Sequence, residues 1–404
     1  MPRKMRQSTA VLMAATSVFV LLFAEWRTNS RALSAADSEN LTNPLPGLTH
    51  QEELDFMAGL ADFMEVETVE DGLGPVFNGK SCAECHAMPS VGGSEPNVGV
   101  ARETRIGRLF NGVFDPLDGS VSGSVNRGGG LLQQRAINLP GCQLKAEVVP
   151  PEATLISLRL STPLFGAGLM EAIPEATILR NASRNGGRPN YVFNPDTGRT
   201  ELGRFGWKAQ VATLHQFAGD AYLNEMGITN PSFPHENLPQ GQPIPSGCDT
   251  VPDPEDDGSG VTAFTNFMRF LAPAPRRPVT DQEKRGEQVF SEIGCASCHV
   301  PTMTTGRNSV AALSRKPVNL FSDLLLHDVG TGDGIEQGQA TGSDFRTAPL
   351  WGLSRRDRFM HDGRSNTIEE AILRHGGEAQ NAVTGFGGLS PSEHDALLAF
   401  LGSL

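Results

Sequence analysis

Apolar residues recur at helical spacing after a helix-capping signal near the start of the chain. Thr49-x-x-Glu52 has the spacing of a capping box and predicts a helix that runs to about Met64. The predicted apolar face of this helix consists of Leu54, Met57 and Leu60.

The same kind of signal occurs twice in the last third of the chain. Thr280-x-x-Glu283 predicts a helix that runs to Cys295, and its apolar residues are Val289, Phe290 and Ile293. Ser390 is followed by Pro391 at a first helical position, and the apolar face of that helix holds Ala396, Leu397, Phe400 and Leu401. A proline-rich stretch over residues 272–278 precedes the first of these helices and is the best candidate for a domain boundary.

The rest of the chain has weaker periodicity. There are 45 glycines and 28 prolines among 404 residues, and residues 90–160 are rich in glycine without a clear period. We therefore expect short helices and long irregular loops, with short strands in that region. The length favours about two domains.

The first 36 residues have the order of an export signal. Arg3, Lys4 and Arg6 precede an uncharged apolar run over residues 8–24, and Ser34-Ala35-Ala36 offers small residues for cleavage. The gap between the run and these residues is long, so an uncleaved anchor also fits. The expected location is the periplasm, an oxidising compartment.

The charge of the chain limits its partners. The net charge is −13, and it becomes −17 without residues 1–36, which hold five basic residues and one acidic residue. This acidity argues against nucleic acid and favours a basic partner. For the acidic stretch over residues 253–257, a solvated loop is favoured over a Ca²⁺ site.

Four of the six cysteines form two Cys-x-x-Cys-His motifs, Cys82 to His86 and Cys295 to His299. This is the c-type haem attachment spacing, in which two thiols add to the vinyl groups of one porphyrin and the histidine ligates the iron. A four-cysteine zinc site normally has its pairs 15–20 residues apart, and a thioredoxin-like pair does not account for the histidine. We therefore predict two covalently attached haem c groups in two cytochrome c-like domains, over residues 37–271 and 280–404, within a mainly α fold.

The other two cysteines are Cys142 and Cys248. In an exported protein, a structural disulfide between them is favoured over a redox-active thiol or two inert thiols.

The second axial ligand decides what each iron can do. For the second haem we favour His375, because it ends an apolar helical stripe formed by Ile368, Ala371 and Ile372. The alternative ligands are Met360, His361, His327 and Met303, although His361 is more typical of a hydrogen-bonded turn.

For the first haem, the informative stretch is residues 203–227. Its helical spacing predicts Trp207 and Glu225 on one apolar face, where a carboxylate needs a partner or a function. An ion pair of Glu225 with Arg204 or Arg188 is the alternative. Gln216 is a weaker candidate, because the same helix would direct it away from Trp207.

Seven segments of this sequence resemble the di-haem oxidoreductase family, whose members are labelled thiol oxidoreductases or peroxidases and are related to bacterial di-haem cytochrome c peroxidases. The segments are residues 163–174, 203–210, 224–230, 323–328, 345–352, 361–364 and 375–378. The resemblance covers about residues 50–404 and implies two cytochrome c-like domains with a periplasmic redox role.

The resemblance also implies roles for particular residues. Glu225-Met226-Gly227 is similar to the motif that supplies the distal glutamate of the peroxidatic haem. Glu369-Glu370-Ala371 is similar to the helix whose methionine, six positions after its first glutamate, ligates the electron-donating haem. That position is His375 here, and a histidine in place of methionine would lower the potential of that haem.

Together these features predict a di-haem peroxidase-like oxidoreductase. Electrons would enter at the second haem, from a small redox protein such as a cytochrome c, and reach the first haem along a path that includes Trp207. Hydrogen peroxide or a similar oxidant would react there, with Glu225 moving a proton and Gln216 orienting the peroxide. The alternatives are a non-catalytic electron-transfer cytochrome and a peroxidase-derived factor that acts on another protein.

Overall fold

Each of the three predicted capping signals begins a helix in the computed structural model, which describes residues 41–95 and 103–404. Helices α1 (His50–Met64) and α7 (Asp281–Glu292) have complete capping boxes, in which threonine and glutamate each satisfy a backbone N–H. Helix α10 (Pro391–Leu401) begins with Pro391 as predicted. Helix α7 ends before Cys295 because Gly294 adopts a left-handed φ of 94°. The predicted export segment lies outside the described residues.

The remaining elements are short. The other helices are α2 (Cys82–Cys85), α3 (Ala167–Glu171), α4 (Glu175–Asn185), α5 (Leu214–Met226), α6 (Ser259–Phe270), α8 (Ile368–Leu373) and α9 (Gln380–Gly387). The strands are β1 (Val76–Phe77), β2 (Glu103–Phe110), β3 (Val113–Asp115), β4 (Arg135–Ala136), β5 (Leu155–Arg159), β6 (Tyr191–Asn194), β7 (Arg199–Leu202), β8 (Met303–Thr304), β9 (Pro317–Val318), β10 (Leu326–Asp328) and β11 (Asp344–Arg346). All strand pairs are antiparallel, and the largest sheet among the described residues has the order β3-β2-β5. These small sheets among helices and loops agree with the mainly α expectation.

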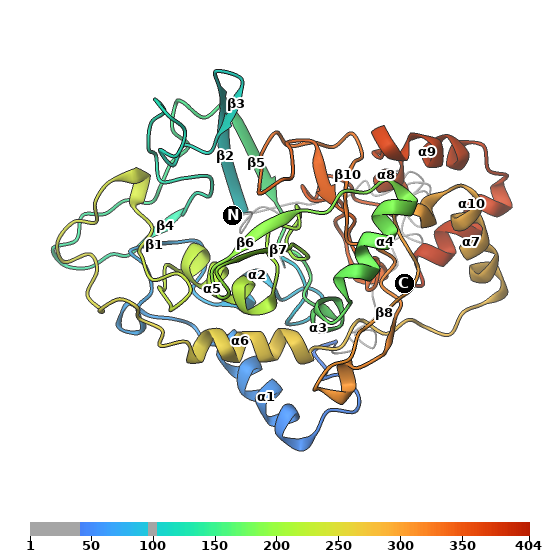
Figure 1. The fold of residues 1–404 in the computed structure, drawn as a ribbon, viewed down its shortest axis with the longest axis horizontal. Coiled ribbons are helices and arrows are strands. Elements are labelled where there is room, and N and C mark those ends of the chain that lie inside the picture. Colours follow the sequence, from blue (N-terminus) through green and yellow to red (C-terminus); the bar gives the residue numbers. More distant parts are fainter. Residues whose placement is uncertain (1–40, 96–102) are drawn as a thin grey trace, which may run out of the picture. The chain divides into compact units, whose positions relative to one another are not determined.

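Each Cys-x-x-Cys-His motif lies between the two helices of a packed pair in the sequence. One helix of each pair precedes the motif and the other follows it. Helix α1 packs against α6, and α7 packs against α10 (Figure 1). Glycine allows both close approaches: a Cβ at Gly59 would lie 2.2 Å from the carbonyl oxygen of Ala263, and one at Gly286 would lie 2.0 Å from that of Ala396. One hydrophobic cluster contains Phe56, Phe63 and Phe267, and a separate one contains Phe290 and Phe400.

The predicted inner face of α1 is wrong for two of its three residues, because only Leu60 packs against the hydrophobic cluster. Leu54 and Met57 are 49% and 57% exposed, whereas Phe56 and Phe63 are buried. The two phenylalanines lie on one stripe and stack on Phe267 of α6, with ring centroids 5.5 and 4.6 Å apart. Burying two aromatic rings removes more apolar surface from water than burying Leu54 and Met57 would, so the larger side chains decide which face turns inward.

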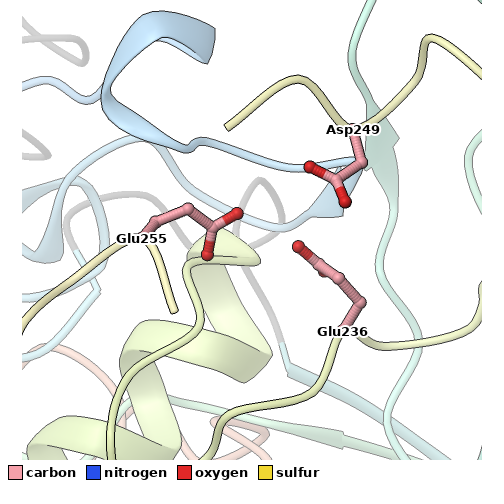
Figure 2. Close-up of side chains that lie close together, drawn as sticks. All are labelled: Glu236, Asp249 and Glu255. Atoms are coloured by element: carbon pink, nitrogen blue, oxygen red, sulfur yellow. The ribbon is translucent and has the colours of Figure 1, made fainter. Parts of the chain in front are cut away.

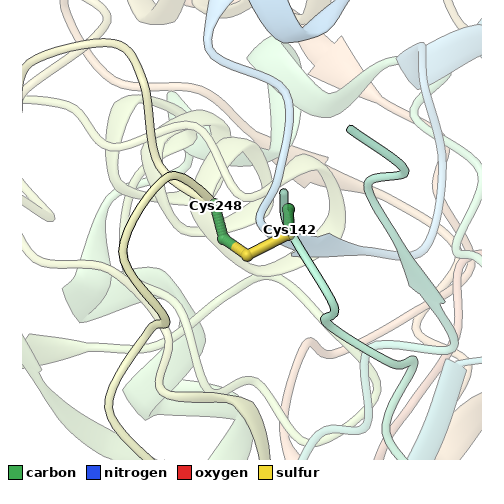
Figure 3. Close-up of a disulfide and its surroundings, with 2 residues drawn as sticks. All are labelled: Cys142 and Cys248. Carbon is green, nitrogen blue, oxygen red and sulfur yellow. A yellow bond between two sulfur atoms is a disulfide. The ribbon is translucent and has the colours of Figure 1, made fainter. Parts of the chain in front are cut away.

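The predicted disulfide between Cys142 and Cys248 is present (Figure 3). It joins segments separated by 106 residues, and both cysteines are buried in the main hydrophobic cluster. The other four cysteines, which belong to the two haem motifs, are free thiols.

Residues 41–404 form one compact unit by their contacts. The proline-rich stretch after Leu271 contains neither helix nor strand up to Thr280, where the cap of α7 begins. The two-domain boundaries stay a prediction. Within the described ranges, no helix has the length and apolar character needed to cross a bilayer.

Candidate haem sites

The first Cys-x-x-Cys-His motif opens onto a cavity of about 310 Å³. Ser81 caps the single turn of α2, which places Cys82, Cys85 and His86 on the cavity wall. Burial raises the pKa of the Cys85 thiol to about 12. The Nδ1 atom of His86 lies 3.0 Å from the Gly93 carbonyl oxygen, to which it can donate. This bond orients the imidazole, and the backbone of Thr162 is a second hydrogen-bond partner of the ring.

Glu225 also lines this cavity, near the end of α5. Asn78 donates a hydrogen bond from Nδ2 to Glu225 Oε2 at 2.8 Å. Burial, together with the charge of Glu103, raises the pKa of Glu225 to about 7. The alternative ion pairs do not form, because Arg204 bonds to backbone carbonyls and Arg188 pairs with Asp344 and Glu378. A carboxylate that titrates near neutral pH is suited to general acid–base catalysis.

Trp207 lines both cavities, although not for the predicted reason. The helix begins only at Leu214, because the side chain of Thr213 caps it and Gly206 and Ala209 both have positive φ. Trp207 therefore lies in a loop, held by a 2.7 Å hydrogen bond from Nε1 to the Leu160 carbonyl oxygen. The prediction of a shared helix face is therefore wrong, although Trp207 and Glu225 line the same cavity.

The structure does not bring Gln216 into the site. Its side-chain oxygen accepts from the backbone N–H of Ala212, and its side-chain nitrogen donates to the carbonyl oxygen of Phe193. Gln216 is buried and does not line the first cavity. We therefore leave it out of the proposed site.

The second motif opens onto a larger cavity of about 470 Å³. Cys295, Cys298, His299 and His375 all line it. The Nδ1 atom of His299 lies 3.0 Å from the Phe321 carbonyl oxygen, and that of His375 lies 2.8 Å from the Ala371 carbonyl oxygen. Both imidazoles thus have Nε2 left for a metal. Helix α8 ends at Leu373, so His375 follows the helix instead of ending it.

Three of the four alternative ligands, His327, Met303 and His361, fit less well. Both ring nitrogens of His327 are engaged, with Asp323 at 2.8 Å and Glu378 at 2.7 Å. Met303 does not line the second cavity, and its sulfur accepts a hydrogen bond from Asn181. Met360 and His361 do line it, but the His361 ring stacks on Phe345 with centroids 3.9 Å apart. Asp362 accepts from the backbone N–H of Arg364, as expected for a hydrogen-bonded turn.

Sequence reasoning missed a buried ion cluster next to Trp207. Lys208 and Arg159 are fully buried and both pair with Asp333, at 3.2 and 2.6 Å. Burial lowers the pKa of Lys208 to about 8. The ammonium group also lies 4.3 Å from the centroid of Phe345, on which His361 stacks. Arg159, Lys208 and Asp333 come from three distant segments of the chain. The only sign of this cluster in the sequence was that Lys208 is adjacent to Trp207.

A second missed cluster is acidic and lies away from both cavities. Carboxylate oxygens of Glu236, Asp249 and Glu255 lie within 4.8 Å of one another, and their side chains point toward a common centre (Figure 2). Both carboxylate oxygens of Glu236 are buried and accept no hydrogen bond within the described residues. Burial, followed by the charges of Glu255 and Asp253, raises the pKa of Glu236 to about 10. Only Glu255 belongs to the acidic stretch that the sequence singled out.

This cluster predicts a pH-dependent stability. A carboxyl group with a pKa raised from 4.5 to about 10 favours the folded state most below pH 4.5, and this contribution is lost as the pH rises toward 10. In the presence of EDTA, Glu236→Gln should therefore make the decline of unfolding free energy from pH 5 to pH 9 shallower. Chemical denaturation at several pH values measures this slope. The exposed Glu53→Gln variant is the control, and a wild-type slope in Glu236→Gln would contradict the prediction.

A family model matches a large part of the chain. Residues 141–404 match the family model described as "Di-haem oxidoreductase, putative peroxidase". This range contains Glu225 and the second Cys-x-x-Cys-His motif, and the first motif precedes it. No curated protein matches the chain.

Several solved structures are similar to the chain at low identity. The diheme peroxidase BthA from Burkholderia thailandensis is 16% identical, with a TM-score of 0.41 over 90% of this chain and 87% of that one. Hydrazine synthase from Kuenenia stuttgartiensis is 16% identical, with a TM-score of 0.40 over 100% of both chains. A MauG-like protein associated with microbial copper homeostasis is 22% identical, with a TM-score of 0.28 over 37% of this chain and 54% of that one. Because the family model matches more than half of the sequence, the protein belongs to the di-haem oxidoreductase family.

Proposed function

We propose that the protein is a di-haem c-type oxidoreductase that reduces a peroxide at the first haem with electrons that enter at the second. The observation that carries this proposal is the difference between the two cavities. Glu225, whose pKa lies near 7, lines the first cavity together with one histidine, His86. In the second cavity, two of the lining histidines, His299 and His375, are each oriented by a backbone carbonyl oxygen through Nδ1, as expected of a pair of iron ligands. A second strong ligand makes an electron carrier, and an open position allows chemistry.

Family membership implies two haems, and the residues of both cavities fit them. Each cavity offers two free thiols three positions apart and an imidazole that is oriented through Nδ1. Both volumes fall in the range of about 300–1,000 Å³ typical of ligand pockets. Cys82 and Cys85 would hold one haem covalently and Cys295 and Cys298 the other. His86, His299 and His375 would ligate iron.

The bound haem would supply redox chemistry, in which peroxide takes up two electrons and two protons and leaves as two water molecules. A side chain of the protein would transfer the proton between the peroxide oxygens. Deprotonated Glu225 would accept a proton from one peroxide oxygen and donate it to the other, so that the departing oxygen leaves as water. The hydrogen bond from Asn78 fixes Glu225 Oε2, which leaves Oε1 for the substrate.

Trp207 would serve the electron path between the haems, because it lines both cavities. Its ring centroid lies 6.2 Å from that of His361, a residue of the second cavity, in an edge-to-face arrangement. The peptide of Leu160 gives a second connection: its carbonyl oxygen accepts from Trp207, and its N–H donates to the carbonyl oxygen of His361.

The electron donor would be a small, basic redox protein such as a cytochrome c, because the chain is acidic. A periplasmic location, with the first 36 residues cleaved or kept as a tether, is proposed from the sequence alone. For residues 253–257, a Ca²⁺ ion stays the less favoured alternative to a solvated loop, and the proposed function does not depend on it.

The deciding experiment is spectroscopy of the purified ferric protein. We expect one high-spin haem that binds cyanide and one low-spin haem that does not. Mass spectrometry of the intact chain should show the added mass of two haems. A His375→Ala variant should convert the low-spin signal to high spin, whereas an exposed-site control, His50→Ala, should leave both signals unchanged.

Two outcomes would overturn the proposal. Two low-spin haems that bind no added ligand would favour the non-catalytic electron-transfer alternative. A polypeptide of unmodified mass after export would exclude covalent haem attachment.

A further inference from the structure

Arg346 and Arg356 lie on the wall of the second cavity. Arg346, the last residue of β11, is only 6% exposed, and Arg356 follows a short turn after Leu353. Both line the cavity that contains Cys295, Cys298 and His375. Among the described residues, neither forms an ion pair with a carboxylate.

The hydrogen bonds of these arginines go to the backbone alone. Arg346 donates from Nε to Gly206 at 2.9 Å and from Nη1 to Thr347 at 3.2 Å. Arg356 donates from Nη2 to the carbonyl oxygens of Pro349 and Trp351, at 3.3 and 3.2 Å. A guanidinium has five N–H donors, so each side chain keeps donors for a further acceptor.

The electrostatic environment of Arg346 and Arg356 favours a bound anion. Burial lowers the pKa of Arg356 to about 10. Burial also lowers the pKa of Arg346 to about 10, and Arg356 is near enough for its charge to act in the same direction. Asp323 acts on Arg346 in the opposite direction, but its own carboxylate already binds His327. A buried cation beside a second, partly buried one is costly when no anion binds them, and a guanidinium pairs with carboxylates through parallel hydrogen bonds.

The arginines that line the first cavity form ion pairs with carboxylates. Its two arginines are already paired with carboxylates of the chain, Arg105 with Glu103 and Arg135 with Glu84. The unpaired cations are therefore a property of the second cavity and not of both haem sites.

We propose that Arg346 and Arg356 bind the two propionate carboxylates of the haem in the second cavity, an inference that rests on the proposed function. The four residues already assigned to this haem fix its vinyl edge and its iron. The arginine pair would fix the opposite edge and thus the rotation of the porphyrin plane. The positive charge would also favour the ferrous state and raise the potential of this haem, against the lowering effect of His375.

The test is a spectroelectrochemical titration of the full-length protein with both haems attached. Arg356→Gln should shift the midpoint potential of the low-spin haem downward and leave the high-spin haem unchanged. Arg356→Lys, which keeps the charge without the planar donor pair, should shift it less. The control is Arg364→Gln, which removes the same charge from a side chain that is 76% exposed and outside the cavity lining. Haem content should equal that of wild type in every variant, because the thioether links remain.

The outcomes separate this inference from the proposed function. Spectra of the wild type test the two haems and their ligands, whereas the variants test the arginines alone. An unchanged low-spin potential in Arg356→Gln, or an equal shift in Arg364→Gln, would overturn the inference. So would a wild-type potential that responds to added phosphate while that of Arg356→Gln does not, because the arginines would then bind a free anion. Arg346→Gln repeats the measurement at the second guanidinium.

Discussion

Replacing Glu225 with glutamine should lower peroxide turnover by about 10²–10⁴-fold, the usual contribution of general acid–base catalysis. Glutamine keeps the shape of the side chain and can still pair with Asn78, but it cannot carry the proton. In the wild type, turnover should rise with pH through about 7, because the carboxylate acts first as a base and must be deprotonated. The variant should lack this inflection. Stopped-flow kinetics with hydrogen peroxide, at several pH values, measure both effects.

Two controls isolate the role of Glu225. The exposed Glu53→Gln variant makes the same chemical change away from both cavities and should turn over peroxide as the wild type does. Haem content and cyanide binding of Glu225→Gln should match the wild type, which shows that the site is intact. Full activity with the pH inflection retained would rule out Glu225 as the proton-transfer group.

Removal of the disulfide should produce the largest loss of stability. The Cys142→Ala, Cys248→Ala double variant frees a loop closed by residues 106 positions apart, which costs about 4–5 kcal/mol in the chain-entropy description. Both sulfurs are buried, so small cavities add to the loss. Guanidinium denaturation followed by far-ultraviolet circular dichroism measures the change in the free energy of unfolding.

The matched control for this variant is Ser246→Ala, a change of similar size in an exposed position beside the disulfide. It should keep the wild-type midpoint. A double variant that loses less than about 1 kcal/mol would mean that the unfolded chain gains little freedom when the bond is absent.

Short-range patterns in the sequence identified much of this protein correctly. The three helix starts depend on a capping residue and its neighbour three positions on, so tertiary contacts are not needed to recognise them. The two Cys-x-x-Cys-His motifs predict haem for the same reason, because the spacing of thiols and imidazole lies within five residues, and the family agrees with two haems. The pairing of Cys142 with Cys248 followed from the count of cysteines that remained.

Predictions that depended on which face of a helix points inward were less secure. Periodicity placed Leu54, Met57 and Leu60 on one stripe, but the competing stripe of Phe56 and Phe63 is the one that packs on α6. The same kind of error extended α5 back toward Trp207, although positive φ at Gly206 and Ala209 prevents a helix there. A periodic pattern reports which residues share a face and does not report what the face meets.

The sequence by itself determined the two attachment motifs, the family and the candidates Glu225 and His375, because each depends on residues close together in the chain or on recognisable segments. Only the tertiary structure decided that Glu225 pairs with neither Arg204 nor Arg188, that Trp207 lines both cavities and that Gln216 is turned away. It also decided that, within the part of the chain that the structure describes, Arg346 and Arg356 form no ion pair with a carboxylate, whereas Lys208 shares Asp333 with Arg159. The physical reason is that burial and charge pairing depend on contacts between segments that are far apart in the sequence. Burial and charge pairing in turn set the protonation state and the electrostatic potential of a site.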